Sequence, residues 1–160
     1  MFDIVATPNV QMFVEPDTGA IWCVGATDQR VDKNFSNKGN VFPSNAKTLA
    51  DMICSALKLT QWLQTRGFTG LAGFDFVEYI HPETGAYDHI FVEINARVNA
   101  ATYPVFLMEH LNTLPAGRSR PLIGAFLSAK ITTKATSFSE LQEMYSRLFF
   151  DPCIGRGIFP

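Results

Sequence analysis

The stretch from Gly70 to Asn99 constrains the fold of this chain more than any other. It holds two runs rich in Phe, Val, Ile and Tyr, GFDFVEYI at Gly73–Ile80 and IFVEIN at Ile90–Asn95. Residues of these types are favoured in strands. The link between the runs contains Pro82 and the pair Thr84–Gly85, which is typical of a turn. The stretch therefore predicts a β-hairpin.

Alternation along the two strands predicts which side chains share a face, because successive strand residues point to opposite sides. The second strand divides into Ile90, Val92 and Ile94 on one face and Phe91, Glu93 and Asn95 on the other. Pairing with the first strand is expected to bring Asp75 onto the face of Glu93 and Asn95. Arg97 follows Asn95 at the same spacing.

The side chains of this shared face suit a metal ion and a phosphate. Asp75, Glu93 and Asn95 offer hard oxygen donors, and Mg²⁺ prefers one or two carboxylates together with phosphate oxygens and waters. Arg97 can hold a phosphate or a carboxylate through two parallel hydrogen bonds. The alternative is a solvated strand face, on which Glu93 and Arg97 form a surface ion pair worth under about 1 kcal/mol.

The segment GFDF followed by VEINARVN resembles the metal-binding end of the ATP-grasp superfamily. Members of that family carry an Asp on one strand and Glu-x-Asn on the next, often followed by x-Arg. The resemblance makes Asp75 the first metal ligand, Glu93 the bridging carboxylate and Asn95 the third ligand. It gives Arg97 a catalytic contact with phosphate or substrate carboxylate, and it places acceptor binding at Asn99–Thr102. The implied cofactors are ATP and Mg²⁺.

The resemblance implies an ATP- and Mg-dependent ligase, in which ATP phosphorylates a carboxylate and an amine or similar nucleophile attacks the acyl phosphate. The implied partners are ATP and a small-molecule or peptide carboxylate or amine substrate. ATP-grasp enzymes also have a second lobe that clamps the nucleotide, and the residues before Asp75 do not resemble it. The chain is therefore expected to be the C-terminal part of the fold, as a fragment, a truncated product or a split subunit. It would be inactive alone and would pair with a missing N-terminal lobe or with a second copy.

The absence of a recognisable clamping lobe leaves a second function open. The chain could be a non-catalytic module derived from an ATP-grasp fold, which binds a partner protein through exposed apolar surface. The set Asp75, Glu93, Asn95 and Arg97 favours the ligase, because a module without catalysis has no reason to keep these residues together.

Composition limits the remaining classes. The 160 residues are expected to form a single domain, with the motif region at 10–110 and an extension at 111–160. Hydrophobic residues make up 47% and the net charge is −2, which argues against disorder and against nucleic acid or an anionic membrane as a partner. No apolar run approaches the roughly 20 residues of a membrane helix. Cys23, Cys54 and Cys153 fit no zinc or redox spacing, so a cytoplasmic setting is expected.

The residues before the organising stretch predict a second hairpin and a loop. Val10–Val14 and Ile21–Gly25 are the expected strands, joined by a turn. Ala26–Ser44 is polar and is predicted to be an irregular loop, similar to one in some ATP-grasp ligases that ends in Gly-Asn-x-x-Pro. Within it, Gln29 and Arg30 are candidates for contacting the nucleotide phosphates. The alternative for this segment is a solvated surface loop.

Helices and one further strand complete the expected fold. The predicted elements are a helix over Asn45–Arg66 that Ser44 caps and Gly67 ends, a helix within Ala100–Leu111, a strand around Ala129–Thr133, and a helix after the capping box Ser137–Glu140. Together these elements predict an α+β fold. Its mostly antiparallel sheet carries helices packed on one face, as the C-terminal part of an ATP-grasp architecture.

Overall fold

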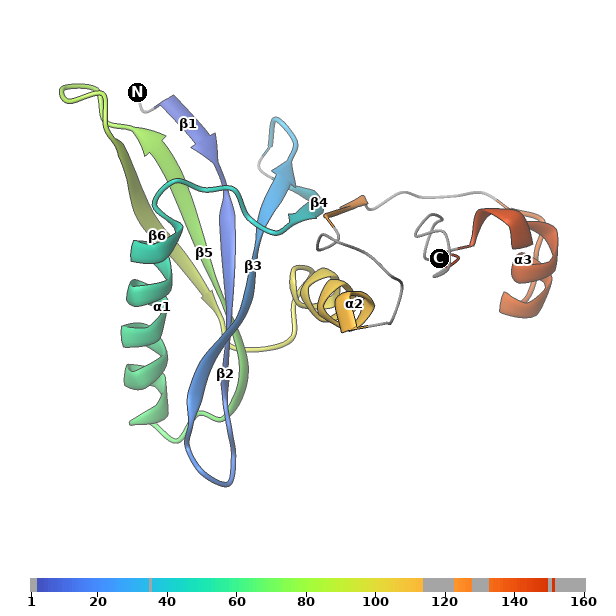
Figure 1. Cartoon of the computed structure of the whole chain (residues 1–160), viewed down its shortest axis with the longest axis horizontal. Helices are drawn as coiled ribbons and strands as arrows, with labels where there is room; N and C mark the ends of the chain where they lie inside the picture. Colours follow the sequence, from blue (N-terminus) through green and yellow to red (C-terminus); the bar gives the residue numbers. More distant parts are fainter. Residues whose placement is uncertain (1–2, 35, 114–122, 128–132, 150, 152–160) are drawn as a thin grey trace.

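The computed structural model describes residues 3–34, 36–113, 123–127, 133–149 and 151. These residues form a curled sheet with helices beside it (Figure 1). The strands are β1 (Asp3–Ala6), β2 (Pro8–Val14), β3 (Ile21–Val31), β4 (Asn37–Phe42), β5 (Gly70–Ile80), β6 (Tyr87–Asn95) and β7 (Gly124–Leu127). The helices are α1 (Leu49–Gln64), α2 (Thr102–Thr113), α3 (Phe138–Met144) and a short 3₁₀ turn, η1 (Ser146–Leu148).

All strand pairs of the described sheet are antiparallel. The strand order is β1-β5-β2-β3-β4-β7, and β6 pairs with β5. Both predicted hairpins are confirmed, as β2–β3 and β5–β6. The α+β class and the antiparallel sheet are confirmed as well.

The two longer helices lie on opposite sides of the sheet, whereas the sequence predicted helices on one face. Val10, Met12, Phe74 and Phe76 form the core with α1. The alternate residue Gln11 points to the other face, where its side chain accepts a hydrogen bond from Thr102 at the start of α2. Figure 1 shows α1 and α2 on either side of the strands. The face opposite α1 is therefore polar near β2 and β5.

The segment that was predicted to be an irregular loop contains strands, because β3 and β4 extend through much of Ala26–Ser44. The additional strand β1 precedes the predicted hairpins. The Ala26–Ser44 segment is polar, yet Thr27 and Asn40 are both buried and their side chains bond each other at 3.2 Å. A strand tolerates buried polar residues when they find partners, so polarity alone was a misleading loop signal here.

Helix α1 begins later than predicted, because a different group satisfies its first turn. Thr48 is the N-cap, and its N–H and hydroxyl donate to the carboxylate of Glu78 at 2.7 and 2.9 Å. Ser44, the predicted cap, instead donates to Asp28. Gly67 has φ of +82°, as expected of the residue that ends the helix. A buried carboxylate at the positive end of the helix takes the place of a local serine.

A β-bulge in β6 changes one part of the predicted alternation. Asp75 lies opposite Glu93, but the next residue, Phe76, lies opposite Phe91, so β6 has one extra residue here. Phe91 therefore packs against Phe76, with ring centroids 5.7 Å apart, on the α1 face. The prediction that Phe91 shares a face with Glu93 and Asn95 was wrong, because the extra residue reverses the alternation.

The C-terminal elements agree in part with the sequence. α2 begins at Thr102, and its Val105 and Met108 pack against Phe42. The predicted cap is confirmed, since Ser137 accepts a hydrogen bond from the Glu140 N–H at 3.2 Å, but the Glu140 carboxylate accepts from the Thr136 N–H and not from that of Ser137. Most of the strand predicted around Ala129–Thr133 lies outside the described residues. The division into a motif region at 10–110 and an extension at 111–160 stays a prediction.

Candidate functional site

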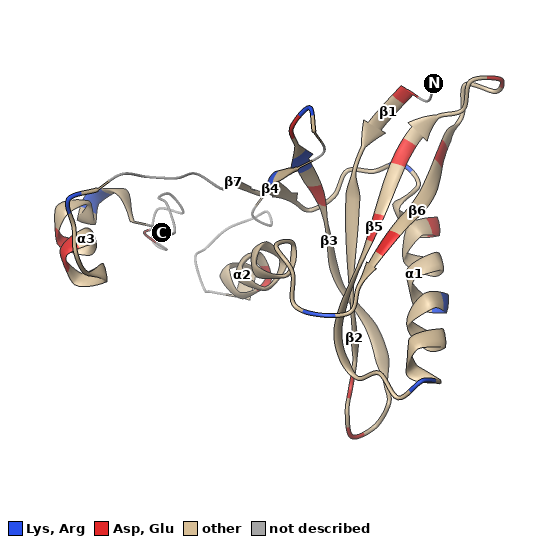
Figure 2. Ribbon diagram, turned by 180° about the vertical axis from the view of Figure 1, so that it is seen from behind, with Lys and Arg blue, Asp and Glu red and all other residues tan. Residues whose placement is uncertain are grey.

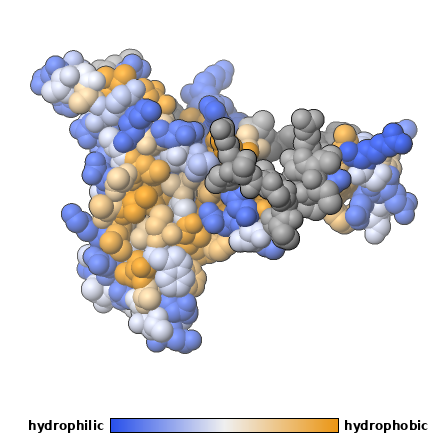
Figure 3. All heavy atoms as spheres, in the orientation of Figure 1, coloured by the Kyte–Doolittle hydropathy of each residue, from blue (hydrophilic) through white to orange (hydrophobic). Residues whose placement is uncertain are grey.

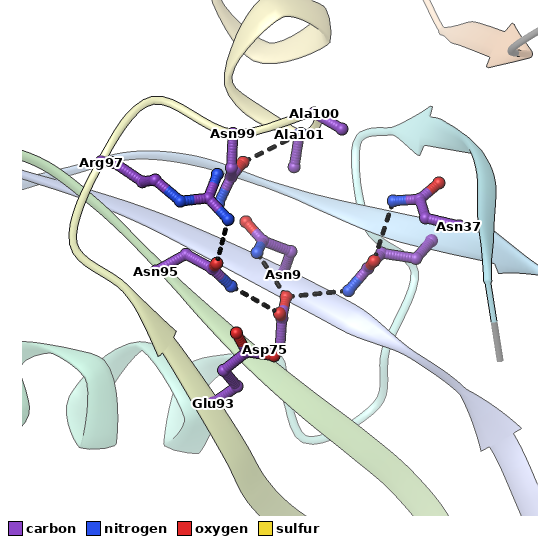
Figure 4. Close-up of a pocket in the computed structure, with 10 residues that line it drawn as sticks. Asn9, Asn37, Asp75, Glu93, Asn95, Arg97, Asn99, Ala100 and Ala101 are labelled. Atoms are coloured by element: carbon purple, nitrogen blue, oxygen red, sulfur yellow. Dashed lines mark hydrogen bonds between the residues drawn. The ribbon is translucent and has the colours of Figure 1, made fainter.

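A cavity of about 300 Å³ opens on the polar face of β2, β5 and β6, beside the start of α2 (Figure 4). The residues that line it are Asn9, Gln29, Asn37, Asp75, Glu93, Asn95, Arg97, Asn99, Ala100 and Ala101. The structure thus brings Asp75, Glu93, Asn95 and Arg97 together, as the strand alternation predicted. Their roles as ligands stay a prediction.

Asp75 lies at the centre of this cavity and is held by three carboxamides. One carboxylate oxygen accepts from Asn9 and from Gln29, the latter at 2.8 Å, and the other oxygen accepts from Asn95 at 2.9 Å. Within the part of the chain that the structure describes, no Lys or Arg forms an ion pair with Asp75. The carboxylate is fixed in place by neutral donors, which leave its negative charge uncompensated.

The surroundings of Asp75 raise the pKa of its carboxyl group above the ordinary value. Burial is the largest cause, because it disfavours the charged form, and the negative charge of Glu93 raises the pKa further. The hydrogen bonds from Asn9, Gln29 and Asn95 act in the opposite direction. Acidic residues recur along β5 and β6 (Figure 2), and Asp75 and Glu93 are directly opposed there.

This raised pKa predicts how the stability of the protein depends on pH. The contribution of Asp75 is fully present below its unfolded-state pKa and is lost as the pH rises through its folded-state pKa. Wild type is therefore expected to lose stability relative to Asp75→Asn across that window. Urea unfolding of both proteins between about pH 2.5 and pH 8 measures the difference.

Asp88 provides a control of opposite sign. Hydrogen bonds from the His89 N–H and from Tyr79 lower the pKa of its carboxyl group. Wild type should accordingly gain stability relative to Asp88→Asn as the pH rises. A difference between wild type and Asp75→Asn that does not vary with pH would contradict the prediction for Asp75.

Asn95 and Arg97 are linked to each other. The Asn95 side chain turns its amide nitrogen to Asp75 and its oxygen to Arg97, whose guanidinium donates to it at 3.0 Å. Arg97 also donates to the Val98 carbonyl at 3.3 Å, and it is exposed. The guanidinium keeps further N–H groups for a ligand. Contact of the Asn95 oxygen with a metal ion requires its amide to turn over.

Arg30 does not join this cavity. Alternation along β3 sends Gln29 to Asp75 and Arg30 to the opposite face. Arg30 instead lines a second cavity of about 460 Å³ together with Val5 and Val31, and Gln29 borders this cavity as well. Of the two candidates from this segment, only Gln29 reaches the carboxylates.

Sequence reasoning missed Asn9 and Asn37. Asn9 donates to Asp75, and Asn37 donates to Gln29 at 2.9 Å. A signal for Asn9 was available, because Asn9 and Gln11 alternate with the apolar Val10 and Met12 in a strand. Such a polar face on a buried strand indicates a built polar site. No comparable signal marks Asn37.

Two features of the described residues limit other kinds of site. No group of three or more His, Cys, Asp and Glu side chains comes together there, so the candidate ligand set has two carboxylates and a carboxamide. The helices within the described residues are also too short or too polar to cross a membrane.

Comparisons with known proteins give little further information. No protein-family model matches the chain, and no curated protein is significantly similar to it. Among solved structures, N5-carboxyaminoimidazole synthetase from Staphylococcus aureus matches with a TM-score of 0.46 and 13% sequence identity. The match covers 63% of this chain and 25% of that enzyme's chain, so this chain spans about a quarter of its length. Similarity at this level does not establish a family.

Proposed function

We propose that the chain is the metal- and nucleotide-binding part of an ATP- and Mg-dependent ligase that activates a carboxylate. The observation that carries the proposal is the pairing of Asp75 with Glu93 across β5 and β6, in one cavity with Asn95 and Arg97. Two adjacent carboxylates repel each other, and a divalent cation between them relieves that repulsion.

The donor set fits Mg²⁺. A carboxylate has about four lone-pair positions, and three of those on Asp75 are taken by carboxamides. The exposed Glu93 carboxylate accepts no hydrogen bond and forms no ion pair with any described residue, so both of its oxygens are available. Asp75 and Glu93 would hold the ion, with Asn95 as a third ligand after its amide turns.

Each remaining residue has a role that its position supports. A bound Mg²⁺ supplies neutralisation of the charge on the nucleotide phosphates. Arg97 is placed to hold a phosphate or a substrate carboxylate through its remaining N–H groups. Gln29 and Asn9 keep the Asp75 carboxylate oriented for the ion. The nucleotide, the carboxylate substrate and the amine acceptor are the proposed partners.

Calorimetric titration with Mg²⁺ and a non-hydrolysable ATP analogue tests the proposal. Wild type is expected to bind the analogue only with Mg²⁺, and Glu93→Gln combined with Asn95→Ala is expected to weaken binding at least roughly 100-fold. Glu83→Gln, in the exposed β5–β6 turn, is the matched control and should bind like wild type. Metal-dependent binding that survives in the double variant would contradict the proposal.

A non-catalytic binding module is the second candidate, and exposed apolar side chains favour it. Trp22, Trp62 and Val92 are 45%, 49% and 58% exposed. Figure 3 shows apolar residues gathered over the part of the surface near α1 and the sheet. This candidate predicts no metal-dependent nucleotide binding by wild type together with association that increases with concentration in sedimentation measurements. A concentration-independent monomer that recovers no partner protein in a pull-down would count against it.

A further inference from the structure

A chain of buried hydrogen bonds runs from Asp75 to the first turn of α2. The Thr102 hydroxyl donates to the side-chain oxygen of Gln11 (Oε1) at 2.9 Å. The side-chain amide of Gln11 (Nε2) donates in turn to the side-chain oxygen of Asn9 (Oδ1). The Asn9 amide then donates to Asp75. Gln11 is fully buried, while Asn9 and Thr102 are 2% and 3% exposed. Water therefore has little access to the Thr102–Gln11 and Gln11–Asn9 bonds, whereas the Asn9–Asp75 bond is half-buried at the cavity.

A branch of the same chain fixes the backbone of the first turn. The Gln11 amide also donates to the Asn99 side-chain oxygen, at 3.0 Å. That oxygen in turn accepts from the backbone N–H groups of Ala101 and Thr102, at 2.9 and 3.2 Å. The N–H groups that begin a helix lack partners within it, so Asn99 supplies the capping acceptor here.

The Asp75 carboxylate at one end and the Asn99 cap at the other fix the direction of the bonds in this hydrogen-bonded series. An ionised carboxylate can only accept, so Asn9 must present its N–H groups to Asp75 and its oxygen to Gln11. Gln11 must then present its N–H groups to Asn9 and Asn99, and its oxygen to Thr102. A change at Asp75 thus affects which groups the first turn of α2 can bond.

Gly73 leaves the space that these side chains fill. A Cβ at Gly73 would overlap the Asn99 amide and would lie 2.7 Å from the Gln11 amide and 3.1 Å from the Asn9 amide. Gly73 pairs with Gln11 on β2 and with Asn95 on β6. The absence of a side chain at this one position allows the three carboxamides to meet.

We infer that Asn9 and Gln11 are positioning residues that couple the Asp75 site to the first turn of α2. Ala100 and Ala101, beside that turn, line the same cavity as the carboxylates. A cation bound at Asp75 is therefore expected to change the position of Ala100 and Ala101 in the cavity. Because coupling is reciprocal, a change at the start of α2 should also change cation affinity. The cation part of this inference rests on the proposed function, whereas the structural coupling does not.

Amide hydrogen exchange without metal tests the structural coupling. Asp75→Ala is expected to reduce the protection of the Ala101 and Thr102 amides from exchange about tenfold. The reason is that Asn9 loses its acceptor, so that the side chains of Asn9 and Gln11 are no longer held in one orientation. Asp75→Asn keeps one side-chain oxygen and should retain most of the protection. Asp51→Ala, an exposed change on α1, is the control. Unchanged protection in Asp75→Ala would overturn the inference.

Calorimetric titration with Mg²⁺ alone tests the coupling in the opposite direction, because the substitution is made at Thr102 and the effect is measured as cation affinity at Asp75. Thr102→Val and Thr60→Val each remove one hydroxyl from a buried threonine. The Thr60 hydroxyl, however, donates to the Ala56 carbonyl within α1 and takes no part in the hydrogen bonds that lead to Asp75. Thr102→Val should weaken Mg²⁺ affinity roughly fivefold, and Thr102→Ser should restore it. Thr60→Val should leave the affinity unchanged. Equal effects of the two valine variants would overturn the coupling.

The two measurements separate failure of the proposed function from failure of the coupling. If wild type binds no Mg²⁺, the proposed cation site is wrong, and the exchange experiment still decides whether Asp75 and α2 are coupled. If wild type binds Mg²⁺ and Thr102→Val binds equally well, the cation site stands and the coupling is wrong.

Discussion

Gly73→Ala is expected to destabilise the protein by about 3 kcal/mol and to weaken cation binding at the same time. The added methyl group would overlap the Asn99 amide and press on the amides of Gln11 and Asn9. These side chains are buried or half-buried and hydrogen-bonded, so moving them leaves polar groups unsatisfied in addition to the steric cost. Urea unfolding and Mg²⁺ titration measure the two effects.

Gly70→Ala, on the same strand, is the control for this substitution. Gly70 has φ of +93°, and a Cβ there would meet nothing within 4 Å. Its cost is therefore backbone strain of about 1 kcal/mol, without crowding. The crowding argument is refuted if Gly73→Ala costs no more than Gly70→Ala, or if it leaves Mg²⁺ affinity intact.

Phe74→Ala is expected to cost about 4 kcal/mol of unfolding free energy. Phe74 has no exposed surface and packs between β5 and α1, with its ring centroid 6.5 Å from that of Phe91. Truncation of a fully buried Phe removes apolar contacts and leaves a cavity, which together cost about 3–5 kcal/mol. Urea unfolding measures the loss directly.

Phe106→Ala serves as the matched comparison, because the Phe106 side chain on α2 is 47% exposed. This change should cost under about 1 kcal/mol, since much of the surface that it removes already meets water. Comparable costs at Phe74 and Phe106 would contradict the assignment of the core to the α1 face of the sheet.

The hairpin and the gathering of Asp75, Glu93 and Asn95 could be predicted because both depend on local pattern. Apolar runs, a turn and a period of two are properties of contiguous residues. The bulge opposite Phe76 could not be predicted, since an extra residue in a strand carries no fixed sequence signature. Phe91 was assigned to the wrong face for this reason alone.

The carboxamides around Asp75 illustrate a different limit. Asn9 and Gln29 come from β2 and β3, and they precede Asp75 by 66 and 46 residues. Their contact with the carboxylate depends on the order and register of three strands, and pattern within a strand does not determine these. Gln29 and Arg30 were both candidates, but alternation along β3 sends only the neutral Gln29 to the carboxylate.

Because the side chains that bond to Asp75 are neutral, the two carboxylates determine the sign of the charge in the cavity. Asp75 and Glu93 outweigh Arg97, so the walls repel a bare polyanion. No described lysine lines the cavity to offset this, and the carboxamides contribute no formal charge. A divalent cation would reverse the sign and turn repulsion into attraction. A site built in this way discriminates by charge before shape, and under the proposed function it would admit a nucleotide only together with a divalent cation.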